Sequence, residues 1–233
     1  NGFEELTIDG IAFDPFATVG INAILEPHNL CYGAGYARSL KPTFFLADIA
    51  GKTSLSGSMI YTLGRELARD LLTIPALTQD DCVILRQESA RLFIWDSIFY
   101  IKKSARPALK FALDCCGLKD HQPKALQPHL TTILAALRET YIYHEIGELH
   151  DTDFDRDTWR EVIAAYQYSP VEYLARAVKD LLADTNDFGT LRYIVKERKT
   201  ASLAFYAAFL DGLAKVFFPE LLASFQNFTR TRD

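Results

Sequence analysis

Helical periodicity runs through nearly the whole second half of the chain, and it limits the possible folds more than any other feature. Apolar residues recur there at intervals of three and four, which places them on one face of a helix. Ser169-Pro170-Val171-Glu172 is a capping box with proline at the first helical position, so it predicts a helix start. The expected helices cover residues 128–150, 156–167, 170–184 and 189–216, with a short one from Pro219. Because the connections are short, residues 121–233 are predicted to form an all-α antiparallel bundle.

The first 120 residues have a mixed pattern. Thr43–Ile49 and Met59–Leu63 are rich in aromatic and branched side chains, with Gly and Ser between them, which predicts a β-hairpin near residues 43–63. The surrounding segments are predicted as a loop at 28–42, a helix at 64–72, a third strand or a helix start at 82–85, and an all-round apolar, central helix at 88–103.

The expected fold class is therefore mainly α, with a small β-hairpin element in an α+β N-terminal half. Gly117, Pro123 and Pro128 mark the predicted boundary between a mixed region, 1–120, and an all-α region, 121–233. One continuous domain is the alternative.

The most informative polar residues lie on the helix expected near residues 128–150. Its apolar stripe, carried by Leu134, Leu137 and Tyr141, continues onto His144 and then Glu148. Glu145 falls beside them. Because a buried carboxylate is costly unless it is paired, a partner is expected.

Arg198 is the predicted partner, since it interrupts the apolar stripe of the segment 189–216. We expect it to pair with Glu148 or Glu145. Glu88 and Asp96 share a face of the helix 88–103 and are expected to join the same internal cluster.

Two interpretations of this cluster remain open. It can be a structural network that fixes the packing of helices, which is the favoured interpretation. It can also be a site in which His144, Glu145, Glu148 and Arg198 are catalytic, with His144 and Glu148 as ligands to a divalent metal ion. The chain has neither an ExxH nor an HExxH motif, so the metal assignment rests on the helical spacing alone.

Composition excludes some classes of protein and sets the expected location. The net charge of −5 argues against nucleic-acid binding, which requires a basic surplus. No apolar run reaches the about 20 residues of a membrane span. The four cysteines include no CxxC pair and are expected to be reduced thiols in a cytoplasmic protein.

Several strings resemble a bacterial family of uncharacterised proteins. They are Leu25-Glu26-Pro27-His28-Asn29-Leu30-Cys31, Thr43-Phe44-Phe45-Leu46-Ala47, Gly64-Arg65-Glu66-Leu67-Ala68-Arg69-Asp70, His144-Glu145-Ile146-Gly147-Glu148 and Ala175-Arg176-Ala177-Val178-Lys179-Asp180-Leu181-Leu182-Ala183-Asp184. The resemblance spans most of the chain. It implies a bacterial cytoplasmic setting and no particular chemistry.

Function is therefore predicted only in outline. The first hypothesis is a protein of unknown function that acts through a protein interface, as a homodimer. The alternative is a metal-dependent or acid/base enzyme that uses the internal His/Glu cluster. A small-ligand site within the ring-rich core is a third hypothesis.

Overall fold

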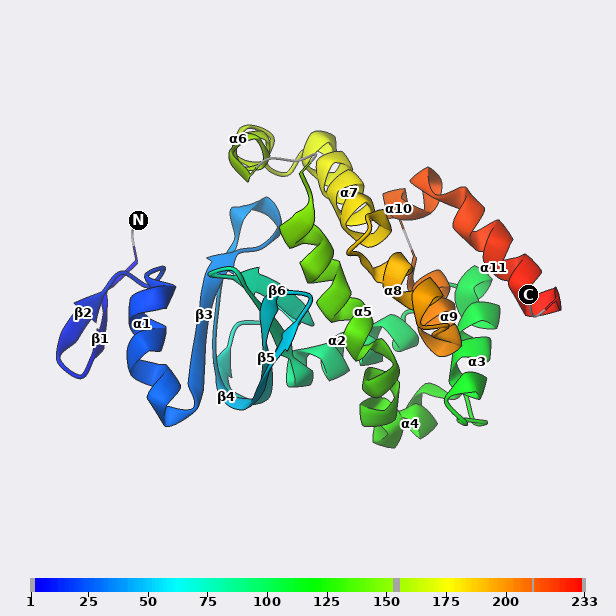
Figure 1. Ribbon diagram of the computed structural model, residues 1–233, viewed down its shortest axis with the longest axis horizontal. Helices are drawn as coiled ribbons and strands as arrows, with labels where there is room; N and C mark the ends of the chain where they lie inside the picture. Colours follow the sequence, from blue (N-terminus) through cyan, green and yellow to red (C-terminus); the bar gives the residue numbers. More distant parts are fainter. Residues whose placement is uncertain (1–2, 153–155, 211, 232–233) are drawn as a thin grey trace.

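A five-stranded mixed sheet, and not a small hairpin, dominates the N-terminal half of the computed structural model (Figure 1). The structure describes residues 3–152, 156–210 and 212–231. The strand order in the sheet is β3-β4-β5-β7-β6, with β5 and β7 parallel and the other pairs antiparallel. The strands are β3 (Leu30–Tyr36), β4 (Pro42–Leu55), β5 (Ser58–Arg69), β6 (Ala76–Gln79) and β7 (Cys82–Arg86). A separate hairpin, β1 (Leu6–Ile8) and β2 (Ile11–Phe13), and helix α1 (Thr18–Leu25) precede the sheet. The predicted fold class, mainly α with one small hairpin, is therefore wrong.

The predicted hairpin is confirmed, but it is much longer than the sequence indicated. Ser56 and Gly57 form its two-residue turn, both with positive φ, as a tight turn between twisted strands requires. The predicted helix at 64–72 is wrong because β5 continues to Arg69 in pairing with β4. Pairing along the whole hairpin outweighs the helix propensity of the Glu, Leu, Ala and Arg residues in that segment.

The sheet curls until its two edge strands meet. The register shifts between β4 and β5 bend the hairpin. At the far edge, the Gln79 side chain of β6 donates to the Tyr32 carbonyl oxygen of β3 (3.1 Å) and accepts from the Ala34 N–H (3.1 Å). The concave face encloses a core of Cys31, Phe45, Ala47, Leu63 and Ile84.

The predicted loop at 28–42 is also wrong, since β3 occupies Leu30–Tyr36. Gly33 and Gly35 lie within this strand and do not mark a loop. A Cβ at Gly33 would lie 2.0 Å from the Phe45 ring, so glycine is required there for close packing inside the curled sheet.

Helix α5 (Leu130–His150) packs on the convex face of the sheet and joins the two halves (Figure 1). Ile142 and Ile146 of α5 share one core cluster with Ile60, Val83 and Leu85 of the sheet. The other helices are α2 (Gln87–Phe99), α3 (Arg106–Cys115), α4 (Pro123–Leu126), α6 (Arg156–Ala165), α7 (Pro170–Thr185), α8 (Thr190–Lys196), α9 (Thr200–Phe209), α10 (Gly212–Phe217) and α11 (Pro219–Thr231). Among the described residues, no helix is both long enough and apolar enough to cross a membrane.

Several helix predictions are confirmed and others are not. The capped helix begins at Pro170 as expected, and the Ser169 side chain accepts a hydrogen bond from the Glu172 N–H. The segment 189–216, in contrast, is divided into α8, α9 and α10, and Arg198 adopts a positive φ of 51° at the first division. The described helices do not show the predicted antiparallel bundle. The acidic residues Asp151, Asp153, Asp155 and Asp157 suit the positive N-terminal end of the helix predicted at 156–167, and of these Asp153 and Asp155 lie outside the described residues.

Helix α2 is not the central helix that residues 88–103 predicted. It ends at Phe99, and Leu92, Phe93 and Phe99 are exposed. Only one side, with Ala90, Ile94 and Ile98, enters the main core.

Candidate metal-binding site between two helices

His144 and Glu148 lie on α5 where that helix faces α7. Both side chains are half-buried, with 28% and 25% of their surface exposed. The predicted helix is therefore confirmed, and His144 and Glu148 lie on a face of it that packs against α7, although neither side chain is fully buried.

A very close approach of the two helices creates the site. A Cβ at Gly147 of α5 would lie 2.1 Å from the Ala183 carbonyl oxygen of α7, so only glycine fits at this contact. The Asn186 side chain at the end of α7 donates to the Gly147 carbonyl oxygen (2.9 Å). This contact brings His144 and Glu148 of α5 close to Asp180 and Asp184 of α7.

Asp184 of α7 orients the His144 ring. Nδ1 of His144 lies 2.9 Å from Oδ1 of Asp184, and the Tyr206 hydroxyl of α9 donates to the other Asp184 oxygen (2.7 Å). A ring held through Nδ1 by a carboxylate presents Nε2 on its other side, as in histidines that ligate metals. Nε2 lies 3.7 Å from Oε1 of Glu148.

Asp180 completes a group of three possible ligands. One ligand atom from each of His144, Glu148 and Asp180 lies within 4.8 Å of the other two. Asp180 is the exposed member, so the group opens toward solvent. Imidazole nitrogen with carboxylate oxygens is a ligand set for divalent zinc, manganese or iron.

The group carries an excess of carboxylates. Lys179 forms an ion pair with Oε2 of Glu148, whereas His144 lies near Oε1. Burial opposes the charged form of His144, but the ion pair with Asp184 outweighs it and raises the pKa of the ring to about 10.

Glu145 faces away from this group, toward the sheet. Its carboxylate accepts a hydrogen bond from the Thr78 hydroxyl of β6 (3.0 Å), and the residue is buried. Burial first, and then the charge of Glu148, raises the pKa of Glu145. Glu145, which was predicted to be catalytic together with His144 and Glu148, therefore lies apart from them, at the contact between α5 and the sheet.

The predicted pairing of Arg198 is wrong. Its side chain is exposed, and among the described residues Glu148 is paired with Lys179 and His144 instead. The positive φ at Arg198 ends the helical phase on which the prediction depended.

The predicted membership of Glu88 and Asp96 is also wrong. Glu88 accepts from the Glu66 N–H (2.8 Å) in the sheet, and Asp96 is exposed on α2. Lys179, Asp180, Asp184 and Tyr206 were not predicted as residues of the site. The spacing of four between Asp180 and Asp184, the same as between His144 and Glu148, was the available signal.

A curled mixed sheet packed on a helical half, with a His/carboxylate group between α5 and α7, defines an α+β protein with a candidate metal site. Two family profiles cover the chain: the N-terminal domain of a family of unknown function, DUF6866, at residues 1–86, and the C-terminal domain of the same family at residues 91–233. The chain belongs to this family. Comparison with curated proteins and with solved structures gives no match.

Proposed function

We propose that this protein binds a divalent transition-metal ion through His144, Glu148 and Asp180 and uses it in metal-assisted hydrolysis. The observation that carries the proposal is the convergence of three ligand atoms within 4.8 Å, two from α5 and one from α7. The orientation of His144 by Asp184 and Tyr206 supports it, because outer partners of this kind fix a ligating imidazole.

The charges around the site also favour a bound cation. Asp180 interacts electrostatically with His144, Glu148, Lys179 and Asp184. When all of these groups are ionised, the three carboxylates Glu148, Asp180 and Asp184 face the two cations His144 and Lys179 among the described residues. Buried charges are normally paired or metal-bound, and a divalent ion would balance this excess.

The exposed side of the site supports a chemical role over a purely structural one. Three protein ligands leave coordination positions open toward solvent, as catalytic metal sites do. A metal ion with an open position lowers the pKa of bound water and supplies a nucleophile near neutral pH.

Metal titration tests the proposal directly. Zn²⁺ and Mn²⁺ would be added to chelator-treated protein in competition with a fluorescent chelator, and bound Co²⁺ would be followed by its visible absorption. We expect one site per chain, and affinity should fall at least about tenfold in Asp180→Asn, since it loses one charged ligand. Lys179→Gln should bind metal more tightly than the unmodified protein, because it removes the cation that competes for Glu148.

Asp187→Asn is the matched control, as Asp187 is an exposed aspartate just after α7. Its metal affinity should stay unchanged. Equal affinities in the unmodified protein, Asp180→Asn and Lys179→Gln would contradict the proposal and leave a structural ion network.

A homodimer is a second proposal, supported by the exposed apolar end of α2. Phe99 and Tyr100 are 56% and 76% exposed, and their rings contact each other. Exposed apolar clusters of this kind mark interaction sites. Light scattering after size exclusion should show a dimer that Phe99→Asp converts to a monomer. Leu71→Asp, at another exposed apolar side chain, should leave it a dimer.

A bacterial cytoplasmic setting is also proposed. Its support is the resemblance given above and the four free cysteines, which suit a reducing compartment.

A further inference from the structure

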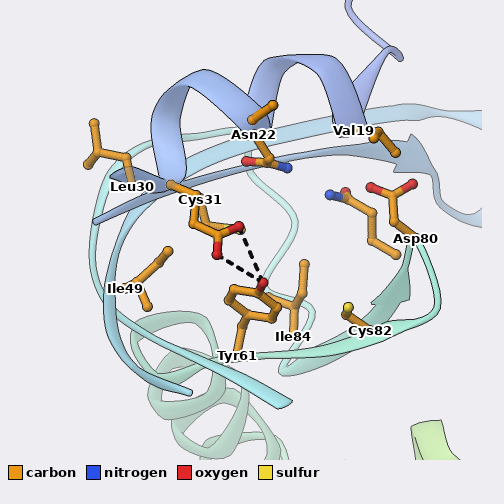
Figure 2. Close-up of a pocket in the computed structure, with 12 residues that line it drawn as sticks. Val19, Asn22, Leu30, Cys31, Ile49, Tyr61, Asp80, Cys82 and Ile84 are labelled. Atoms are coloured by element: carbon orange, nitrogen blue, oxygen red, sulfur yellow. Dashed lines mark hydrogen bonds between the residues drawn. The ribbon is translucent and has the colours of Figure 1, made fainter. Parts of the chain in front are cut away.

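A cavity of about 220 Å³ opens between α1 and the end of the curled sheet (Figure 2). It lies in the N-terminal half, and none of the candidate metal ligands lines it. Its volume is below the about 300 to 1,000 Å³ of sites for drug-sized ligands, so any ligand must be small.

Side-chain hydrogen bonds hold the walls of this cavity in place. Asn22 of α1 accepts from the Tyr32 N–H (2.8 Å) and donates to the Tyr32 carbonyl oxygen (2.9 Å), which fastens α1 to β3. Gln79 fastens β6 to the same strand. A preformed cavity binds with a smaller entropic cost than one that must be ordered.

The cavity has an apolar interior and an acidic rim. Ile49, Ile84 and the Tyr61 ring line its inner part, and Asp80 lies at its edge in the β6–β7 turn (Figure 2). Glu26 also lines it, but that carboxylate already holds Lys52 and the Tyr61 hydroxyl. No cationic side chain of the described residues lines the cavity, and the part of the chain described provides no hydrogen bond or ion pair for the Asp80 carboxylate.

Burial is the main cause of raised pKa values at three ionisable groups of the cavity, and the nearby carboxylates add to the rise. Burial and then the charge of Glu26 raise the pKa of the Cys31 thiol to about 12. Burial and then Asp80 raise the pKa of Cys82, and burial and then Glu26 raise the pKa of Tyr61. The nearby carboxylates therefore oppose a negative charge in the cavity, which disfavours an anionic ligand.

We infer that this cavity binds a small organic cation, a primary ammonium group on a short apolar body. The apolar body would occupy the space against Ile49, Ile84 and the Tyr61 ring. The ammonium group would lie at the rim beside Asp80.

Three probes with one carbon skeleton test the charge preference: 3-methylbutylamine, 3-methylbutan-1-ol and 3-methylbutanoate. Binding would be measured by protein chemical-shift titration at low salt. We expect the amine to bind about fivefold more tightly than the alcohol, and the carboxylate to bind more weakly than both. Equal binding of amine and alcohol, or tightest binding of the carboxylate, would overturn the inference.

Two variants locate the ligand. Asp80→Asn should weaken amine binding about fivefold without changing alcohol binding, because asparagine tolerates the positive φ of 51° at this position. Asp81→Asn is the matched control: it changes the next residue of the same turn, which does not line the cavity, and should have a smaller effect. Ala23→Phe, at an exposed position of α1 on the cavity wall, should block all three probes. If Asp80→Asn and Asp81→Asn bind the amine equally, Asp80 is not its partner and the inference fails.

The ammonium group can belong to a free amine or to a peptide N-terminus. Leu-Gly-Gly and its N-acetylated form distinguish these sources. Tighter binding of Leu-Gly-Gly than of the amine would assign the cavity to peptide termini, and weaker binding would assign it to free amines. Binding of the acetylated peptide as tight as that of Leu-Gly-Gly would count against the charge preference itself.

Discussion

Replacing Glu172 with glutamine should strongly destabilise the protein, because this carboxylate joins the sheet to α7. Glu172 is fully buried. It accepts hydrogen bonds from the Ser39 N–H (2.7 Å), the Tyr168 N–H (2.9 Å) and the Arg176 side chain (2.9 Å). Ser39 lies between β3 and β4, so one ionised side chain connects both halves of the molecule.

The magnitude follows from the pKa of this group. Burial alone would raise it, but the two backbone donors and Arg176 outweigh burial and lower the pKa from 4.5 to about 2. A shift of this size stabilises the folded protein by about 3 kcal/mol at pH 7. Because the folded-state pKa lies below the unfolded one, this stability is present above pH 4.5 and is lost as the pH falls toward about 2.

Urea unfolding, followed by tryptophan fluorescence, provides the assay. Glu172→Gln should lower the free energy of unfolding by about 3 kcal/mol at pH 7 and by about 2 kcal/mol at pH 3.5. Glu161→Gln, at an exposed position of α6, is the control and should change it by less than about 0.5 kcal/mol. A loss below about 1 kcal/mol at pH 7, or a loss that is the same at both pH values, would refute the argument.

Three further perturbations test the packing and the thiols. Gly147→Ala should lower the free energy of unfolding by about 1 to 3 kcal/mol in urea titrations, because its Cβ would meet the Ala183 carbonyl oxygen at 2.1 Å. The same substitution should weaken metal binding. An unchanged midpoint would show that α5 and α7 separate freely. Ser169→Ala should lower the free energy of unfolding by about 0.5 to 2 kcal/mol, since the capping hydrogen bond of α7 is lost, and Ser169→Asp should restore most of it. The thiols can be compared by mass spectrometry after iodoacetamide treatment at pH 8. The exposed Cys115 should be modified in the folded protein, whereas the buried Cys31, with its pKa raised to about 12, should be modified only after unfolding. Rapid labelling of Cys31 in the folded protein would contradict its burial.

Features that depend on neighbours in the chain were predictable from the sequence. The start of α7 at Pro170 was predicted because a capping box acts within four residues. The residues that share one face of α5 were predicted because the spacing of side chains around a helix is the same wherever the helix packs. His144 and Glu148 fall on the same face as the apolar residues of this helix. Half of the candidate site was therefore visible in the sequence alone.

Features that depend on distant segments were decided only by the tertiary structure. The segment 64–72 contains helix-forming residues, but pairing with β4 makes most of it a strand, and the curl of the sheet depends on Gln79 reaching across to β3. The other half of the site, Asp180 and Asp184, meets α5 because Gly147 allows the backbones to touch. Such contacts join residues far apart in the chain, and no local pattern specifies which distant segment will pack against a given face. The sequence by itself thus determined the faces of single helices, while the tertiary structure decided which faces meet.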